Sequence, residues 1–97
     1  MGNFKELKVW QKAKDLAVEI YRITEKGKLQ SDFGLKDQMR RAAVSIPSNI
    51  AEGDELNSNR QSVKYLYIAK GSLAELQTQL IIANEIGYFD QNVFPKF

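Results

Sequence analysis

Residues 63–86, VKYLYIAKGSLAELQTQLIIANEI, are the stretch that decides the fold. Of these 24 residues, 14 are apolar, and they do not alternate with polar residues. Placed at 100° per residue, they spread nearly around a helical cylinder, and a helix that is apolar on most faces must be covered on most faces. We therefore predict a helix over residues 59–86, covered by a fourth helix or by other subunits as well as by the rest of this chain.

Two further helices are predicted before this one. Apolar residues that recur at three- and four-residue steps predict helices over residues 4–26 and 32–52, and Gly53 is expected to end the second. In the second, Pro47 has no N–H to donate, so we expect a kink or short break near residues 43–47. No segment alternates with period two. The sequence therefore predicts an all-α protein, a single domain over residues 1–97 built as an antiparallel helical bundle.

The segment that follows Gly87 is short and aromatic. Gly87 is expected to end the third helix. Tyr88, Phe89, Phe94 and Phe97 would be costly to leave in water. The chain ends before another helix can form, so the fourth helix of a four-helix bundle is predicted to be missing or rudimentary.

Composition excludes several kinds of chemistry. The 97 residues include no Cys and no His, which removes disulfides, thiolate nucleophiles, the usual zinc sites and the commonest general base. Asp54 and Glu55 lack the several oxygens at fixed spacing that a calcium loop requires. No base is placed beside Ser45 or Ser48, although a Ser–Lys dyad stays an open alternative. We therefore expect no catalytic residue, no metal and no cofactor, and predict that the protein is not an enzyme.

No stretch of the sequence looks like a membrane span or a signal peptide. The longest apolar runs are residues 65–69 and 80–83, whereas a membrane-spanning helix needs about 20 apolar residues. The first residues lack the apolar region of a signal peptide. We therefore expect a cytoplasmic protein with no membrane partner.

Positive charge is concentrated in the first part of the chain. The formal net charge is +2, of which residues 1–41 carry +4 and residues 42–97 carry −2. This asymmetry hints at a polyanionic partner. Arg40 and Arg41 precede three buried-looking apolar residues, so at least one lies near an interface. The sequence leaves two roles open for them, a buried structural pair or a phosphate contact.

Lysines form a second candidate site. Lys5, Lys8 and Lys12 share one face of the first predicted helix, at i, i+3 and i+7. Cations in the first turn of a helix interact unfavourably with the helix dipole, so their presence there suggests that they have a function. Asp15 and Glu19 continue the same stripe, however, and a solvated mixed face is the favoured interpretation.

Aromatic residues give a weaker signal. Trp10, Tyr21, Tyr65 and Tyr67 lie at helical core spacing. Such rings can stack on nucleic-acid bases, but core packing is the favoured interpretation for all four.

Three stretches resemble a known family. They are residues 7–13, LKVWQKA; residues 33–53, which include the run RRAAVSIPSNIAEG; and residues 67–80, YIAKGSLAELQTQL. They resemble the bacterial four-helix-bundle proteins encoded in intervening sequences of 23S rRNA genes. The run at residues 40–53 is highly specific, and the resemblance covers nearly the whole chain.

This resemblance implies an up-down bundle that assembles as a ring, commonly a pentamer. It also implies kinship with the accessory variability determinant of diversity-generating retroelements, which looks like a basic barrel that binds nucleic acid and a reverse transcriptase. The matching basic positions are Lys8, Lys12, Arg40 and Arg41. We therefore expect a non-enzymatic oligomer that binds RNA or DNA through these four residues and Lys5. The alternative is a scaffold that binds only proteins, through its apolar helix surface.

Overall fold

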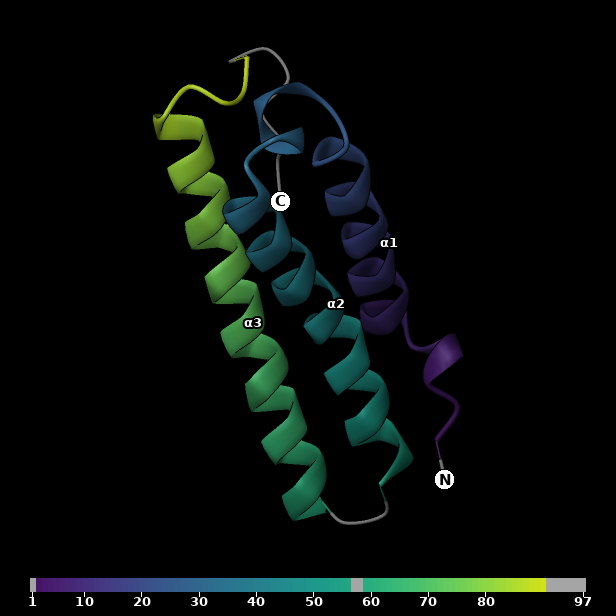
Figure 1. Cartoon of the computed structure of the whole chain (residues 1–97). Coiled ribbons are helices and arrows are strands. Elements are labelled where there is room, and N and C mark those ends of the chain that lie inside the picture. The colour runs from purple at the N-terminus through teal and green to yellow at the C-terminus, as the bar shows by residue number, and fades with distance from the viewer. Residues whose placement is uncertain (1, 57–58, 91–97) are drawn as a thin grey trace.

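The chain folds as an elongated bundle of helices. The computed structural model describes residues 2–56 and 59–90, and every regular element in them is helical (Figure 1). Two 3-10 turns, η1 (Phe4–Glu6) and η2 (Gly27–Gln30), accompany three long helices: α1 (Lys8–Ile23), α2 (Phe33–Glu55) and α3 (Asn59–Glu85). The prediction of an all-α helical bundle is therefore confirmed.

The central helix of the bundle is α2. It packs against both α1 and α3, whereas contacts between α1 and α3 are sparse. The three helices run up, down and up, and α1 and α3 stand on either side of α2 (Figure 1). The bundle measures 44 × 20 × 19 Å. The described residues therefore form three helices of a bundle, with one side open between α1 and α3.

The first predicted helix is divided in two. Residues 4–26 were expected to form one helix, but Leu7 is extended (φ −72°, ψ 125°) and separates η1 from α1. The division lets the rings of Phe4 and Trp10 meet edge to face, with centroids 5.1 Å apart. Leu7 itself packs against the core. Burial of these apolar groups therefore outweighs helical continuity at this point.

The second helix is longer than predicted and has no break. It continues through Pro47, where a kink or break was expected, to Glu55. Asn49 Nδ2 donates to the Ser45 carbonyl oxygen at 2.7 Å and to Ser45 Oγ at 2.9 Å. Pro47 removes one N–H from the helix, but α2 is packed against helices on two sides and stays continuous.

Gly53 lies inside α2 and does not end it. Its role is to allow a close approach between two helices. A Cβ added at Gly53 would lie 3.1 Å from the Ser62 carbonyl oxygen and 3.4 Å from Tyr65 Cβ. Ser62 Oγ in turn donates to the Gly53 carbonyl oxygen at 2.7 Å. The missing side chain thus allows the end of α2 to lie directly against the start of α3.

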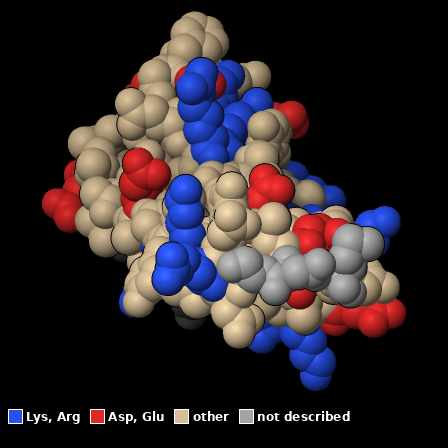
Figure 2. Space-filling view, turned by 90° about the horizontal axis from the view of Figure 1, so that it is seen from below, with Lys and Arg blue, Asp and Glu red and all other residues tan. Residues whose placement is uncertain are grey.

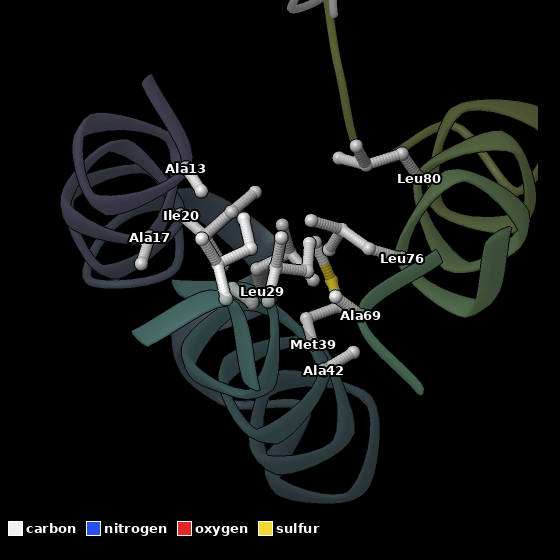
Figure 3. Close-up of a cluster of buried hydrophobic side chains, with 12 residues drawn as sticks. Ala13, Ala17, Ile20, Leu29, Met39, Ala42, Ala69, Leu76 and Leu80 are labelled. Carbon is white, nitrogen blue, oxygen red and sulfur yellow. The ribbon is translucent and has the colours of Figure 1, made fainter. Parts of the chain in front are cut away.

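The core lies where the three helices face one another. Side chains from α1, α2 and α3 converge on a common centre (Figure 3). The buried cluster comprises Ala13, Ala17, Ile20, Leu29, Met39, Ala42, Ala43, Ile46, Ile50, Ala69, Leu76 and Leu80. Five of these residues are alanines, whose small side chains let the helix backbones approach closely.

The end of α3 is a Schellman motif. The Tyr88 N–H donates to the Ala83 carbonyl at 2.9 Å and the Gly87 N–H donates to the Asn84 carbonyl at 3.1 Å. Gly87 has φ +84°, so the prediction that it ends the helix is confirmed. The turn brings Tyr88 and Phe89 against the core, and Phe94 and Phe97 lie outside the described residues.

The third helix keeps a large uncovered apolar surface. Seven apolar residues of α3 and its C-terminal end are between 41% and 68% exposed: Val63, Leu66, Tyr67, Ile68, Ile81, Ile82 and Ile86. Within the described residues, α1 and α2 therefore cover only part of α3, as its apolar pattern predicted. No helix in this part of the chain is long and apolar enough to cross a membrane.

Candidate nucleic-acid and assembly surfaces

Lys8 and Lys12 form a basic pair on α1. Lys8 is the first residue of the helix, and Lys12 lies one turn later on the same face. Both are exposed, and neither forms a salt bridge within the described residues. Lys5 is also exposed but belongs to η1, where its carbonyl accepts a hydrogen bond from Gln11 Nε2 at 2.9 Å. The structure therefore brings Lys8 and Lys12 together and sets Lys5 apart on the preceding turn.

The position of this pair is electrostatically unfavourable in the isolated chain. The first turn of α1 contains no acidic residue, and Lys8 places a cation at the positive end of the helix dipole. Like charges at i and i+4 also repel one another, by a few tenths of a kcal/mol. An anion bound near Lys8 and Lys12 would relieve both effects.

Arg40 ties α2 to the C-terminal end of α1. Its Nε donates to Thr24 Oγ1 at 2.8 Å, and its Nη2 donates to the Tyr21 carbonyl at 3.4 Å. The guanidinium carbon lies 4.4 Å from the centroid of the Tyr21 ring. Thr24 is fully buried and donates to the Ile20 carbonyl at 2.7 Å. Arg40 thus satisfies polar groups where α1 ends, and its positive charge suits that end of the helix dipole.

Arg41 points outward instead. Its Nε lies 3.0 Å from Asp37 Oδ2, one helical turn away, and the two side chains are 81% and 62% exposed. A surface pair of this kind contributes at most about 0.5 kcal/mol. The two adjacent arginines therefore differ: Arg40 is part of the internal structure, and Arg41 is a surface cation.

The five predicted site residues do not form one patch. Tyr21, on which Arg40 rests, lies 13 residues after Lys8, or about 20 Å along the helix. It also lies nine residues after Lys12, which at 100° per residue is the opposite side of α1. On the end of the molecule shown in Figure 2, Lys and Arg side chains stand in separate groups with Asp and Glu side chains between them.

Two rings that were expected in the core are exposed. The core-packing prediction is wrong for Tyr21 and Tyr67, which are 41% and 68% exposed, whereas Trp10 and Tyr65 are half-buried. Phe33, which the sequence pattern did not single out, is 71% exposed. It is the first residue of α2, directly after the Asp32 cap. This position lies outside the apolar repeat of the helix, and that is the sequence signal that could have predicted its exposure.

Two separate hollows lie near opposite ends of the bundle, on the open side between α1 and α3. Near the start of α3, a hollow of about 280 Å³ is bordered by Leu7 and Val9 on one side and by Leu66 on the other. Near the other end, a hollow of about 450 Å³ lies between Ile23 and the side chains of Tyr88 and Phe89. The first of these hollows adjoins the exposed apolar surface of α3 at Leu66.

The family model described as 23S rRNA-intervening sequence protein matches residues 5–97. The chain belongs to this family. In this member of the 23S rRNA-intervening sequence protein family, the matched region includes all three helices and both groups of basic residues. No curated protein matches the chain significantly. Within the described residues, no group of three or more acidic side chains is arranged to hold a metal ion.

Proposed function

We propose that this protein is a non-enzymatic oligomer that binds nucleic acid, or serves as an adaptor on it, with Lys5, Lys8 and Lys12 as phosphate contacts. The observation that carries the proposal is the Lys8–Lys12 pair, which is exposed, forms no salt bridge with any residue that the structure describes, and lies at the positive end of α1. Arg41 is an additional surface cation, whereas Arg40 acts mainly by fixing Tyr21. On the basis of the family resemblance, the proposed oligomer is a pentameric ring in the bacterial cytoplasm, and it has no cofactor.

Self-association is supported by the uncovered apolar surface of α3. Large exposed apolar patches mark interaction sites, and a ring requires two different contact surfaces on each subunit. At 100° per residue, Val63, Leu66 and Ile81 lie on one side of the buried row of α3, and Ile68, Ile82 and Ile86 lie on the other. A ring would also multiply the small positive charge of each subunit.

Light scattering at low micromolar concentration tests the assembly. The expected result is a multimer, and Ile81→Lys should reduce its mass because a charge would be buried at the contact. Val18→Lys is the matched control, because Val18 is 41% exposed on α1, and it should leave the mass unchanged. A monomer with native helicity would refute the assembly.

Fluorescence anisotropy with labelled RNA and DNA, at 50 and 200 mM salt, tests the basic pair. Lys8→Glu with Lys12→Glu should weaken binding strongly and flatten the salt dependence, because each lost phosphate contact lowers the slope by roughly 0.7–0.9. The control, Lys14→Glu with Lys28→Glu, changes the net charge equally at other exposed positions and should have a smaller effect. Absence of binding by the intact oligomer at low salt would refute the proposal.

A scaffold that binds only proteins is the second candidate, and the seven exposed apolar residues of α3 and its C-terminal end favour it. The two functions differ in their response to charge reversal. If the variant with Lys8→Glu and Lys12→Glu binds no nucleic acid but still captures a protein partner, the scaffold function is supported.

A further inference from the structure

A second surface, on the other side of α1 from Lys12, carries two exposed aromatic rings. Phe33, at the start of α2, is 71% exposed, and Tyr21, near the end of α1, is 41% exposed. Two adjoining shallow hollows, of about 510 and 470 Å³, lie beside them. One hollow includes Phe33, the other includes Tyr21, and both include Asp37 and Arg40. The two hollows share Asp37 and Arg40, and we call the surface formed by their lining residues the ring face.

Each ring of this face carries a cation that is held in place. Lys36 Nζ lies 4.9 Å from the Phe33 centroid and donates to the Gln30 carbonyl at 3.0 Å. Arg40 lies 4.4 Å from the Tyr21 centroid and is fixed by Thr24. A lysine has three N–H donors and an arginine has five, so both keep donors for a further acceptor. Their positions are already fixed, which reduces the entropy lost on binding an anion.

The charge of the ring face is positive. Its two hollows are lined by three cations, Lys36, Arg40 and Arg41, and by one carboxylate, Asp37. Asp37 is already paired with Arg41. A ligand that suits this face therefore carries negative charge and also presents flat apolar surfaces to the rings.

We propose that the ring face binds single-stranded nucleic acid, with unpaired bases stacked at Phe33 and Tyr21 and phosphates at Lys36, Arg40 and Arg41. This inference rests on the proposed function and names the class of nucleic acid. Exposed aromatic rings beside cations bind single strands because every base has a face that can stack. In a duplex the bases are already stacked on one another, so no base is free to stack on the rings of the ring face. The guanidinium plane of Arg40 offers a further stacking surface above Tyr21.

Binding of single strands and duplexes should therefore differ. Labelled 12-nucleotide strands of oligo-U and oligo-dT are titrated at low salt against a hairpin RNA of equal charge. The intact protein should bind the single strands more tightly than the hairpin, and the two single strands distinguish RNA from DNA as the source. Equal or tighter binding of the hairpin would overturn the inference.

Substitutions of Phe33 test stacking directly, because this exposed side chain is not needed for the core. Phe33→Ala should weaken binding of single strands by about tenfold, and Phe33→Leu, which keeps apolar bulk without a ring, should weaken it similarly. Phe33→Trp keeps an aromatic ring and should bind single strands as the parent protein does. In a Trp10→Phe background, the emission of that new tryptophan should be quenched by oligo-U.

The failure of this inference is distinguishable from the failure of the proposed function. If Phe33→Ala binds single strands normally while Lys8→Glu with Lys12→Glu does not, the ring face is refuted and the lysine site stands. If oligo-glutamate competes as well as oligo-U of equal charge, charge alone acts and the ring face is refuted. If no nucleic acid binds, both proposals fall.

Discussion

Tyr88 Oη donates a hydrogen bond to Asp32 Oδ2 at 2.8 Å, although the two residues lie 56 positions apart in the chain. The other carboxylate oxygen, Asp32 Oδ1, accepts the N–H of Leu35 at 3.1 Å and so caps α2. One carboxylate therefore holds the start of α2 and also the residue that follows the turn at the end of α3.

This hydrogen bond predicts a dependence of stability on pH. The Tyr88 hydroxyl, followed by the Leu35 N–H, lowers the pKa of Asp32, and the bond to Asp32 raises the pKa of Tyr88. The contribution of Asp32 is therefore present above its unfolded pKa of about 4 and is lost as the pH falls through the lower folded value. The contribution of Tyr88 is present below its unfolded pKa of about 10 and is lost as the pH rises through the higher folded value.

Tyr88→Phe isolates this contribution, because it removes the hydroxyl and leaves the cap of α2 in place. The variant should be less stable than the parent at pH 7, and the difference should shrink at both pH extremes. Urea unfolding of both proteins at pH 3, 7 and 11 measures it. A difference that does not vary with pH would show that this hydrogen bond is not the cause.

The two adjacent arginines should contribute unequally to stability. Arg40→Ala removes charge-assisted hydrogen bonds to Thr24 and Tyr21, so we expect a loss of about 2 kcal/mol. Arg41→Ala removes only the exposed pair with Asp37, and we expect a loss below about 0.5 kcal/mol. Chemical denaturation of both variants gives the comparison, and equal losses would contradict the structural role of Arg40.

Two helical glycines should respond in opposite directions. Nothing lies within 4 Å of a Cβ added at Gly71, so Gly71→Ala should stabilise α3 by about 0.5–1 kcal/mol. A Cβ at Gly53 would meet the Ser62 carbonyl at 3.1 Å, and Gly53→Leu should destabilise the bundle by about 1–3 kcal/mol because it forces α3 away from α2. Thermal unfolding measures both, and an unharmed Gly53→Leu protein would argue against the close approach.

Lys8→Glu should improve folding and impair binding together. An acidic residue at the first position of α1 suits the helix dipole, and it pairs with Lys12 at i+4 in the favourable order. We expect a gain of about 0.5–1 kcal/mol in the free energy of unfolding. Affinity for nucleic acid should fall in the same variant. A protein that gains stability and keeps its affinity would remove Lys8 from the proposed site.

Much of the fold could be predicted from local sequence patterns, and the errors have physical causes. The stop at Gly87 follows from a backbone conformation that glycine adopts readily. Gly53 carries the same signal but serves the contact with Ser62, which depends on a helix that follows later in the chain. Pro47 likewise predicts a kink or short break, and α2 stays continuous between its two neighbours.

Local sequence patterns predict only part of the arrangement of the candidate site residues. Lys8 and Lys12 could be placed together because i and i+4 share a face of any helix. The exposure of Tyr21 depends on how α1 and α2 are rotated against each other, and its place in the apolar repeat alone indicated burial.

The sequence by itself determined that the chain forms long helices, that α3 is apolar beyond what its neighbours can cover, and which family it belongs to, because periodicity and motifs are local properties. Tertiary structure alone decided the different roles of Arg40 and Arg41. The two residues are chemically identical and adjacent, but a rotation of 100° directs one toward the end of α1 and the other toward solvent. It also decided that Asp32 and Tyr88 meet, because a hydrogen bond between residues 56 positions apart exists only once the helices have packed.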